Sequence, residues 1–176
     1  MQTIGIFFGS DTGNTESIAY LICNALKPHN SQVYDIANSS KEKIEKFNIL
    51  LFGIPTWYYG EMQCDWEDFL PTFKKINFNN KIIGLFGCGD QEDYSEYFCN
   101  AMGTIYNLIK HHNNVYLIGE WSTKGYLFDE SKAVLKNDHF CGLTLDEDRQ
   151  PEKTKFRIMT WTKQIINEIH VITTNN

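Results

Sequence analysis

The stretch Gly9–Glu16, with the sequence GSDTGNTE, lies between a short apolar run and a helical pattern. The run before it, Ile4–Phe8, has the composition of a buried strand, and after it apolar residues recur every three or four positions from Ile18 to Leu26. The stretch therefore predicts a tight turn from a strand into a helix. Its glycines let the backbone approach a ligand, and the helix start adds unpaired N–H groups and the positive end of the helix dipole.

Such a turn suits a phosphate group. It is neither a Walker A loop nor a dinucleotide fingerprint, because three residues separate Gly9 from Gly13, Asn14 follows where a lysine would be needed, and no GxGxxG motif is present. The first basic residue of the chain is Lys27. We therefore expect a neutral cradle for a terminal phosphate monoester. The alternative is an ordinary helix start with Asn14 or Thr15 as its N-cap.

The chain has 176 residues, which is enough for a sizeable core, and we expect a single domain over residues 1–176. Its formal charge of −6 argues against a nucleic-acid partner, and it has no apolar run of about eighteen residues that could span a membrane. No basic-then-apolar leader precedes the first strand, so we expect a cytoplasmic protein. The five cysteines and five histidines lack metal-ligand spacings, so we expect reduced thiols and no metal site.

Strand-like and helix-like segments alternate along the chain. Strands are expected at Ile4–Phe8, Gln32–Ile36, Ile49–Gly53, Lys81–Gly87 and Val115–Gly119. Continuous apolar runs such as ILLFG indicate strands that are covered on both faces. The repetition predicts an α/β fold, a doubly wound sheet of five parallel strands in the order 2-1-3-4-5 with helices on both faces. The weakly periodic segment Glu120–His139 predicts an insertion at the fifth strand, and loops of this length tend to be functional.

In such a sheet, ligands bind outside the carboxyl ends of the strands, where the strand order reverses. This places the turn at Gly9 beside two loops, Ile54–Cys64 and Gly87–Tyr97. Both loops carry large aromatic residues that are costly to expose, namely Trp57, Tyr58, Tyr59, Tyr94 and Tyr97. Each of them taken alone would more often belong to the core. A phosphate turn between two aromatic loops, however, indicates a sandwich for a planar ring on a phosphorylated tail.

Four motifs resemble the signatures of the flavodoxins, most closely those of the long-chain enterobacterial type: FFGSDTGNTE, GIPTWYYGEMQCDW, FGCGDQEDYSEYFCNAMG and LDEDRQPE. The resemblance covers essentially the whole chain and includes the insertion in the fifth strand. It implies a flavodoxin-like fold with FMN as a non-covalent cofactor. It also implies that the protein is an electron carrier, which moves one electron at a time and is not an enzyme with a substrate of its own.

The resemblance further assigns roles to residues of the crevice. The phosphate would lie in a cradle formed by Ser10, Asp11, Thr12, Gly13, Asn14 and Thr15. The flavin ring would stack between Trp57 and Tyr94. The backbone would hold the polar edge of the ring at Pro55, Thr56, Cys88, Gly89 and Asp90. Asp146 would lie near the ribityl chain, and the cofactor-binding set is completed by Tyr58, Tyr59, Gly60 and Tyr97.

The three crevice segments Gly9–Leu26, Ile54–Phe73 and Gly87–Ile109 contain ten carboxylates and neither lysine nor arginine. A unit charge ~10 Å from the flavin costs an added electron about 1–2 kcal/mol at an effective dielectric constant of about 20, so we expect a low potential. The same acidic rim should steer basic faces of partners towards the flavin. The resemblance implies an NADPH:flavodoxin (ferredoxin) reductase and acceptor redox enzymes as these partners, and we expect the carrier to be a monomer.

Two other functions use the same fold. A flavodoxin-like NAD(P)H:quinone reductase would need a substrate pocket over the flavin, which a stacked Tyr94 would obstruct. A response-regulator receiver would need an acidic pair after the first strand and an aspartate at the end of the third, which instead ends in Gly53-Ile54-Pro55. We set the receiver aside and keep the quinone reductase as the alternative.

One stretch departs from the pattern of some flavodoxins, in which a glycine-containing peptide flips so that a backbone carbonyl meets the reduced flavin ring. The equivalent stretch here is Trp57-Tyr58-Tyr59-Gly60. A flip of the peptide between the two tyrosines would lack the conformational freedom of glycine. We therefore expect the same kind of semiquinone stabilisation, without a glycine to ease the flip.

Overall fold

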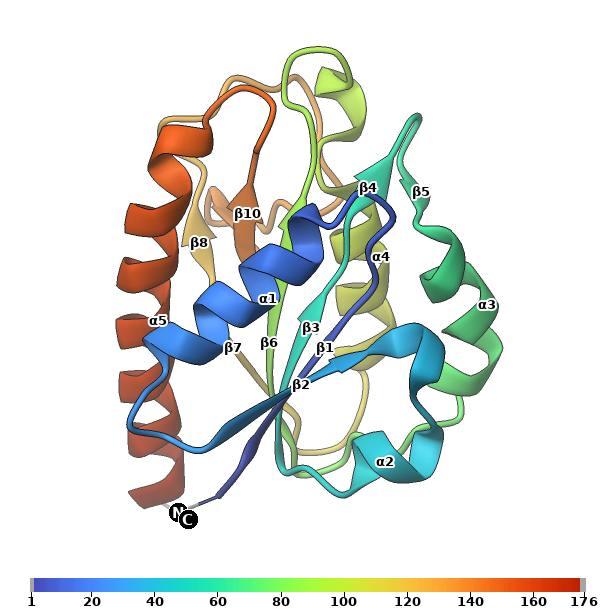
Figure 1. The fold of residues 1–176 in the computed structure, drawn as a ribbon, viewed down its shortest axis with the longest axis vertical. Coiled ribbons are helices and arrows are strands. Elements are labelled where there is room, and N and C mark those ends of the chain that lie inside the picture. The colour runs from blue at the N-terminus through green and yellow to red at the C-terminus, as the bar shows by residue number, and fades with distance from the viewer. Residues whose placement is uncertain (1, 175–176) are drawn as a thin grey trace.

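The computed structural model describes residues 2–174, which form a central parallel sheet with helices on both faces (Figure 1). The strands of this sheet are β1 (Ile4–Phe8), β2 (Ser31–Asp35), β3 (Ile49–Gly53), β6 (Ile82–Cys88), β7 (Tyr116–Ile118) and β10 (Leu143–Leu145). They lie in the order β2-β1-β3-β6, and β7 and β10 both pair with β6, one after the other along its length. The predicted order of parallel strands is therefore confirmed, with the fifth strand divided in two.

β3 shows why these strands are apolar at every position. Leu50 and Phe52 lie in one half of the hydrophobic core, and Ile49 and Leu51 lie in the other half. Successive side chains of a strand point to opposite faces, so a strand that helices cover on both sides has no polar face.

The predicted second strand, Gln32–Ile36, has different bounds in the structure. β2 ends at Asp35, whose carboxylate accepts a hydrogen bond from the N–H of Ala37 (2.9 Å). This contact turns the chain into a short 3-10 helix, η1 (Ile36–Asn38), in which Ile36 is still fully buried. The side chain therefore reaches the core from a turn rather than from a strand.

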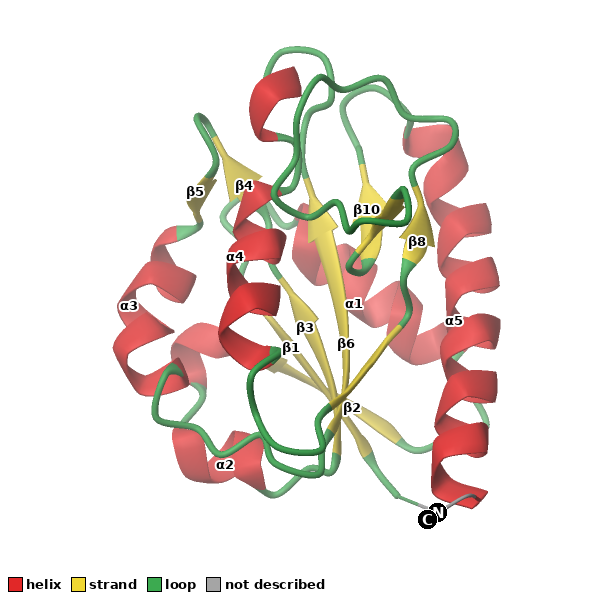
Figure 2. Ribbon diagram, turned by 180° about the vertical axis from the view of Figure 1, so that it is seen from behind, coloured by secondary structure: helices red, strands yellow, loops and turns green. Residues whose placement is uncertain are grey.

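The helices lie in two layers. Their bounds are α1 (Asn14–Ala25), α2 (Lys41–Glu45), α3 (Cys64–Phe73), α4 (Asn100–Ile109) and α5 (Pro151–Thr174). α1 and α5 cover one face of the sheet (Figure 1), and α3 and α4 cover the other (Figure 2). α5 begins at Pro151, a favourable residue there because proline has no N–H that would stay unpaired in the first turn. Within residues 2–174, no helix is both long enough and apolar enough to cross a membrane.

The segment between β7 and β10 is the insertion that the sequence predicts at Glu120–His139. It contains the short antiparallel strands β8 (Trp121–Ser122) and β9 (His139–Phe140). The hydroxyl of Tyr126 ties it to the sheet by donating a hydrogen bond to the carbonyl of Thr144 (2.7 Å).

The insertion also packs against α4 (Figure 2). The side chain of Asn100 accepts a hydrogen bond from the N–H of Lys132 (2.6 Å). A Cβ atom on Gly103 would lie only 2.3 Å from the carbonyl oxygen of Lys132. This glycine therefore allows a close approach of the helix backbone to the insertion.

We predict that Gly103→Ala destabilises the protein by about 1–3 kcal/mol, because the added methyl group collides with backbone that cannot move independently. Helix propensity alone would give the opposite sign, a stabilisation of about 1 kcal/mol. Urea unfolding of the two proteins measures the difference. Asn107→Ala, at an exposed position of the same helix, is the control and should stabilise slightly. A stabilised Gly103→Ala variant would show that the insertion does not press on α4.

Candidate functional site

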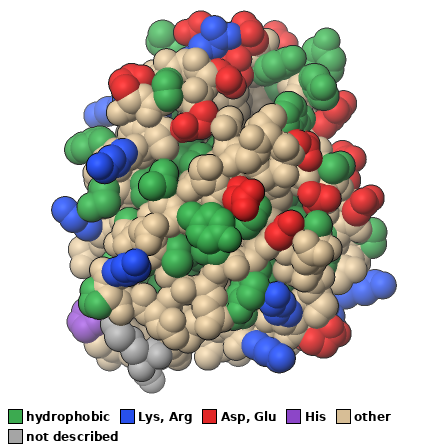
Figure 3. All heavy atoms as spheres, in the orientation of Figure 1, with side chains coloured by type: hydrophobic (Ala, Val, Ile, Leu, Met, Phe, Trp, Pro, Cys, Tyr) green, Lys and Arg blue, Asp and Glu red, His purple; other side chains and the backbone are tan. Residues whose placement is uncertain are grey.

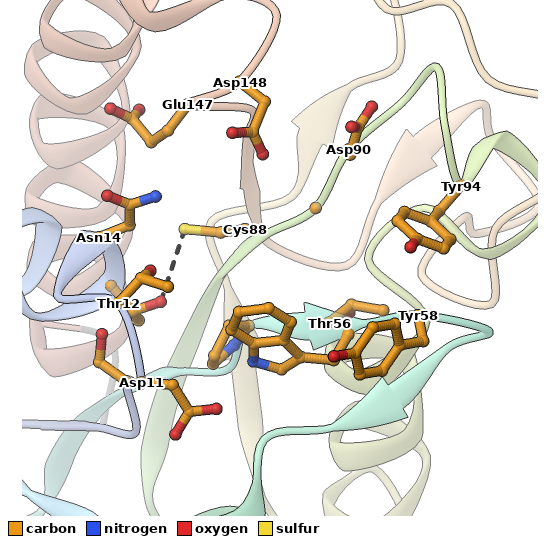
Figure 4. Close-up of a pocket in the computed structure, with 15 residues that line it drawn as sticks. Asp11, Thr12, Asn14, Thr56, Tyr58, Cys88, Asp90, Tyr94, Glu147 and Asp148 are labelled. Atoms are coloured by element: carbon orange, nitrogen blue, oxygen red, sulfur yellow. Dashed lines mark hydrogen bonds between the residues drawn. The ribbon is translucent and has the colours of Figure 1, made fainter.

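A cavity of ≈ 440 Å³ opens at the carboxyl end of the sheet, between the turn after β1 and the loops after β3 and β6. Figure 4 shows Asp11, Thr12 and Asn14 along one side of it, and Tyr58 and Tyr94 on the other. Most of the predicted site residues line this cavity: Ser10, Asp11, Thr12, Asn14, Thr15, Pro55, Thr56, Trp57, Tyr58, Cys88, Gly89, Asp90 and Tyr94. The structure thus brings the three predicted segments together.

The turn after β1 leaves the start of α1 without a side-chain cap. The N-cap position is taken by Gly13, with a φ of 87°, and its own N–H donates to the hydroxyl of Ser10 (3.0 Å). The sequence alternative of Asn14 or Thr15 as N-cap is wrong, since the helix already begins at Asn14. Thr15 is buried in the first turn, and its hydroxyl donates to the sulfur of Cys88 (3.7 Å). The first N–H groups of α1 therefore remain available to an anion in the cavity.

The loop after β3 forms a small hairpin of β4 (Thr56–Trp57) and β5 (Glu61–Met62). Tyr58 stands in its turn with a φ of 41°, in the left-handed region that large side chains rarely occupy. Its ring meets that of Tyr94 edge-on, with 6.3 Å between the centroids. The conformation at Tyr58 is therefore held by its surroundings and not by glycine-like freedom.

Trp57 lies on the inner strand of this hairpin and lines the cavity. Its indole nitrogen is buried and has no hydrogen-bond partner among residues 2–174. A buried donor without an acceptor costs about 1–3 kcal/mol, and a molecule bound in the cavity could supply the acceptor.

The last part of β6 lies backbone to backbone against Ile54, the first residue after β3. The N–H of Ile54 donates to the carbonyl of Phe86 (2.9 Å), and a Cβ atom on Gly87 would lie 2.7 Å from the carbonyl oxygen of Ile54. Cys88 ends β6, and the loop then carries Gly89 and Asp90 along the cavity before it reaches Tyr94. Burial raises the pKa of the Cys88 thiol to about 12, so this wall of the cavity presents a neutral S–H group at physiological pH.

The turn after β10 contributes two residues that the sequence interpretation missed, Glu147 and Asp148, which Figure 4 shows above Cys88. The predicted residue of this turn, Asp146, does not line the cavity. It is fully buried, with one oxygen accepting from the backbone and side-chain N–H groups of Gln91 (3.0 and 2.8 Å). Its other oxygen accepts from the N–H groups of Asp148 (3.2 Å) and Arg149 (2.9 Å). The LDEDRQPE motif pointed to this turn, but three successive acidic residues gave no signal for which of them faces inward.

Four other predicted residues lie around the cavity but not on its wall: Gly13, Tyr59, Gly60 and Tyr97. Tyr59 is 72% exposed, and its ring meets those of Tyr94 and Tyr97 edge-on at 6.3 and 5.7 Å. These tyrosines form an aromatic cluster outside the cavity. Their contact with a cofactor stays a prediction.

The three crevice segments suggested that the charged rim of the cavity is wholly acidic, but the structure adds one arginine to it. Arg149, from the turn after β10, forms ion pairs with Asp90, Glu92 and Asp93 at the closest N–O distances of 3.1, 3.6 and 2.6 Å. Burial opposes the ionised form of Asp90, but the Arg149 guanidinium and two backbone N–H groups hold the pKa of that carboxyl below its ordinary value. Four acidic residues still line the cavity, and none of the lining residues is basic.

Among residues 2–174, one group of side chains has the composition of a metal site. Asp11, Cys64 and Asp65 place ligand atoms within 4.8 Å of one another. The side-chain amide of Gln63 already donates to both carboxylates, at 2.9 and 2.5 Å. An amide therefore bridges these charges in the structure.

We predict that Asp146→Asn lowers the free energy of unfolding by about 2–3 kcal/mol, because an amide must present its NH₂ group to one of the two pairs of N–H donors. Urea unfolding of the apoprotein measures this loss. Asp148→Asn, two residues on and exposed, makes the same change of charge and should shift the midpoint little. Equal effects of both variants would contradict a structural role for Asp146.

Comparison with known proteins agrees with this geometry. The flavodoxin family model matches residues 6–161. The chain is 62% identical to the flavodoxin of Buchnera aphidicola subsp. Baizongia pistaciae (97% of this chain, 98% of that one) and 57% identical to flavodoxin 1 of Escherichia coli K12 (97% of each). The fold superposes with a TM-score of 0.87 on the crystal structure of Fusobacterium nucleatum flavodoxin bound to flavin mononucleotide, at 36% identity over 96% of this chain and 99% of that one. The chain therefore belongs to the flavodoxin family.

Proposed function

We propose that this protein carries electrons, one at a time, on an FMN bound in the cavity at the carboxyl end of the sheet. The observation that carries the proposal is the cavity itself, which joins an uncapped helix start to the aromatic rings of Trp57 and Tyr94. Members of the same family support it, among them the Fusobacterium nucleatum flavodoxin whose structure contains flavin mononucleotide.

The residues present fit such a cofactor. Two kinds of hydrogen-bond donor are available to the phosphate of FMN. They are the buried, unpaired indole N–H of Trp57 and the uncapped N–H groups at the start of α1. No lysine or arginine lines the cavity, so the phosphate would be held by hydrogen bonds and the helix dipole alone. The hydroxyls of Ser10 and Thr12 and the amide of Asn14 complete the proposed cradle.

FMN, when bound, supplies the one-electron redox chemistry. The protein contributes binding, orientation and electrostatics. Trp57 and Tyr94 would cover the flat faces of the ring and exclude water, and Asp11, Asp90 and Asp148 would disfavour added negative charge. Each carboxylate ~10 Å away contributes about 1–2 kcal/mol, and a tenfold change in equilibrium constant corresponds to about 59 mV for a one-electron couple. We infer a low potential for the most reduced couple.

The quinone reductase alternative gains no support. The relatives named above match over nearly the whole chain and are flavodoxins, and Tyr58 and Tyr94 meet edge-on at the mouth of the cavity, where a second substrate would have to lie. Electron transfer would instead occur through the exposed edge of the site to a partner protein.

We propose that these partners present basic faces, as an NADPH:flavodoxin (ferredoxin) reductase and its acceptor enzymes would. Exposed carboxylates stand on the hairpin and on the first turns of α3 beside the cavity, namely Glu61, Glu67 and Asp68. Exposed charges act chiefly on the rate of association and are screened by salt over about 10 Å at 0.1 M ionic strength.

We predict that the apoprotein binds FMN with one-to-one stoichiometry and binds riboflavin far more weakly, because riboflavin lacks the phosphate. Thr12→Val should weaken FMN binding about tenfold, the loss of a hydrogen bond to a charged group, and should leave riboflavin binding unchanged. Quenching of flavin fluorescence measures both constants. Equal affinity for the two flavins would remove the phosphate cradle from the proposal.

We predict that reversing Glu67 and Asp68 to Lys slows reduction by the reductase at low salt and leaves FMN bound, because both carboxylates are exposed and lie off the cavity wall. The second-order rate constant is followed by stopped flow as ionic strength rises. Glu42→Lys on α2, at the opposite end of the sheet (Figure 1), is the control and should have little effect. A rate that responds neither to salt nor to the double reversal would mean that the acidic rim plays no part in docking.

A further inference from the structure

Arg149 lies at the cavity's edge, in the turn between β10 and α5. Figure 3 shows a basic side chain among acidic ones at the top of the molecule, the end at which β10 leads into α5. The guanidinium of Arg149 donates two hydrogen bonds to Asp90, from Nε to Oδ1 (3.2 Å) and from Nη2 to Oδ2 (3.1 Å). It also pairs with Glu92 and Asp93.

The exposure of the partners decides which of these contacts matters. The side chains of Glu92 and Asp93 are 58% and 69% exposed, and ion pairs at such positions contribute little. The side chain of Asp90 is only 13% exposed, and its contact with Arg149 is bidentate, which is the strong geometry for this pair of groups. The Arg149–Asp90 pair is therefore the main contact.

Asp90 in turn shapes the loop that follows it. Its Oδ1 atom accepts hydrogen bonds from the N–H groups of Glu92 (2.9 Å) and Asp93 (3.0 Å). The residue between them, Gln91, is held separately by the buried carboxylate of Asp146. Four consecutive residues are thus tied, directly or through Asp90, to the turn after β10, and the next residue along the chain is Tyr94.

We propose that Arg149 is a positioning residue of the cofactor site, which fixes Asp90 and thereby holds Tyr94 against the cavity, while its charge offsets nearby carboxylates. The effect on the loop is a property of the apoprotein, and only the effects on FMN affinity and on potential rest on the proposed function.

The two effects can be separated by substitution. Arg149→Lys keeps the positive charge but loses the planar, bidentate contact, and Arg149→Gln loses both. If Arg149 acts through geometry, both variants loosen the loop. If its charge also reaches the flavin, only Arg149→Gln lowers the potential, because only that variant removes a positive charge.

The first measurement is amide hydrogen exchange of Glu92 and Asp93 in the apoprotein, without any flavin. Exchange of these two N–H groups should be about tenfold faster in both variants, because local opening exposes the bonds to Asp90. Asp90→Asn should give the same acceleration. Lys155→Gln, an exposed charge removed on α5, is the control and should give none. Unchanged exchange in all three loop variants would overturn the proposal.

The second measurement is FMN titration and potentiometry of the same proteins. FMN affinity should fall about tenfold in Arg149→Lys and Arg149→Gln, and the potential should drop only in Arg149→Gln. Equal changes in Lys155→Gln would overturn the proposal by reducing it to a general charge effect. Failure of the wild-type protein to bind FMN would overturn the proposed function alone, because the exchange result does not depend on flavin.

Discussion

The uncapped start of α1 determines what the cavity can hold. In most helices a serine, threonine, aspartate or asparagine side chain accepts hydrogen bonds from the first N–H groups. Here Gly13 occupies that position, Ser10 caps only the glycine's own N–H, and Thr15 turns inward to Cys88. The turn thus leaves the positive end of a helix dipole open at the carboxyl edge of the sheet, where the cavity carries carboxylates but no cation. A phosphate monoester supplies the missing acceptor without requiring a lysine.

The other walls of the cavity come from the loops after β3 and β6, at the same edge of the sheet. β6 and the start of the loop after β3 meet backbone to backbone at Gly87 and Ile54, and the loops that continue from there line the same cavity. Tyr58 keeps a left-handed conformation in the process. A strained backbone conformation persists only where the surrounding structure holds it in place, and in this protein the strained residue lines the cavity.

Much of this could be predicted from the sequence because the signals were local. β1 and β3 are uninterrupted apolar runs, and both have the bounds that those runs predict. Pro151 marks the start of α5 for the same local reason. The N-cap of α1 could not be chosen correctly, because the residues around Gly13 all have side chains that cap helices well. The orientation of Thr15, for example, depends on Cys88, which lies on β6.

The charges around the site could be predicted from the sequence only in part. Charges counted over sequence windows made all three crevice segments appear free of any cation, and within those segments this is correct. The arginine that pairs with Asp90 comes from a turn 59 residues further along the chain. A parallel sheet brings its carboxyl ends together regardless of separation in sequence, so the field at such a site depends on every turn at that edge. The low potential expected of this rim is therefore a balance between its carboxylates and the one guanidinium that pairs with three of them.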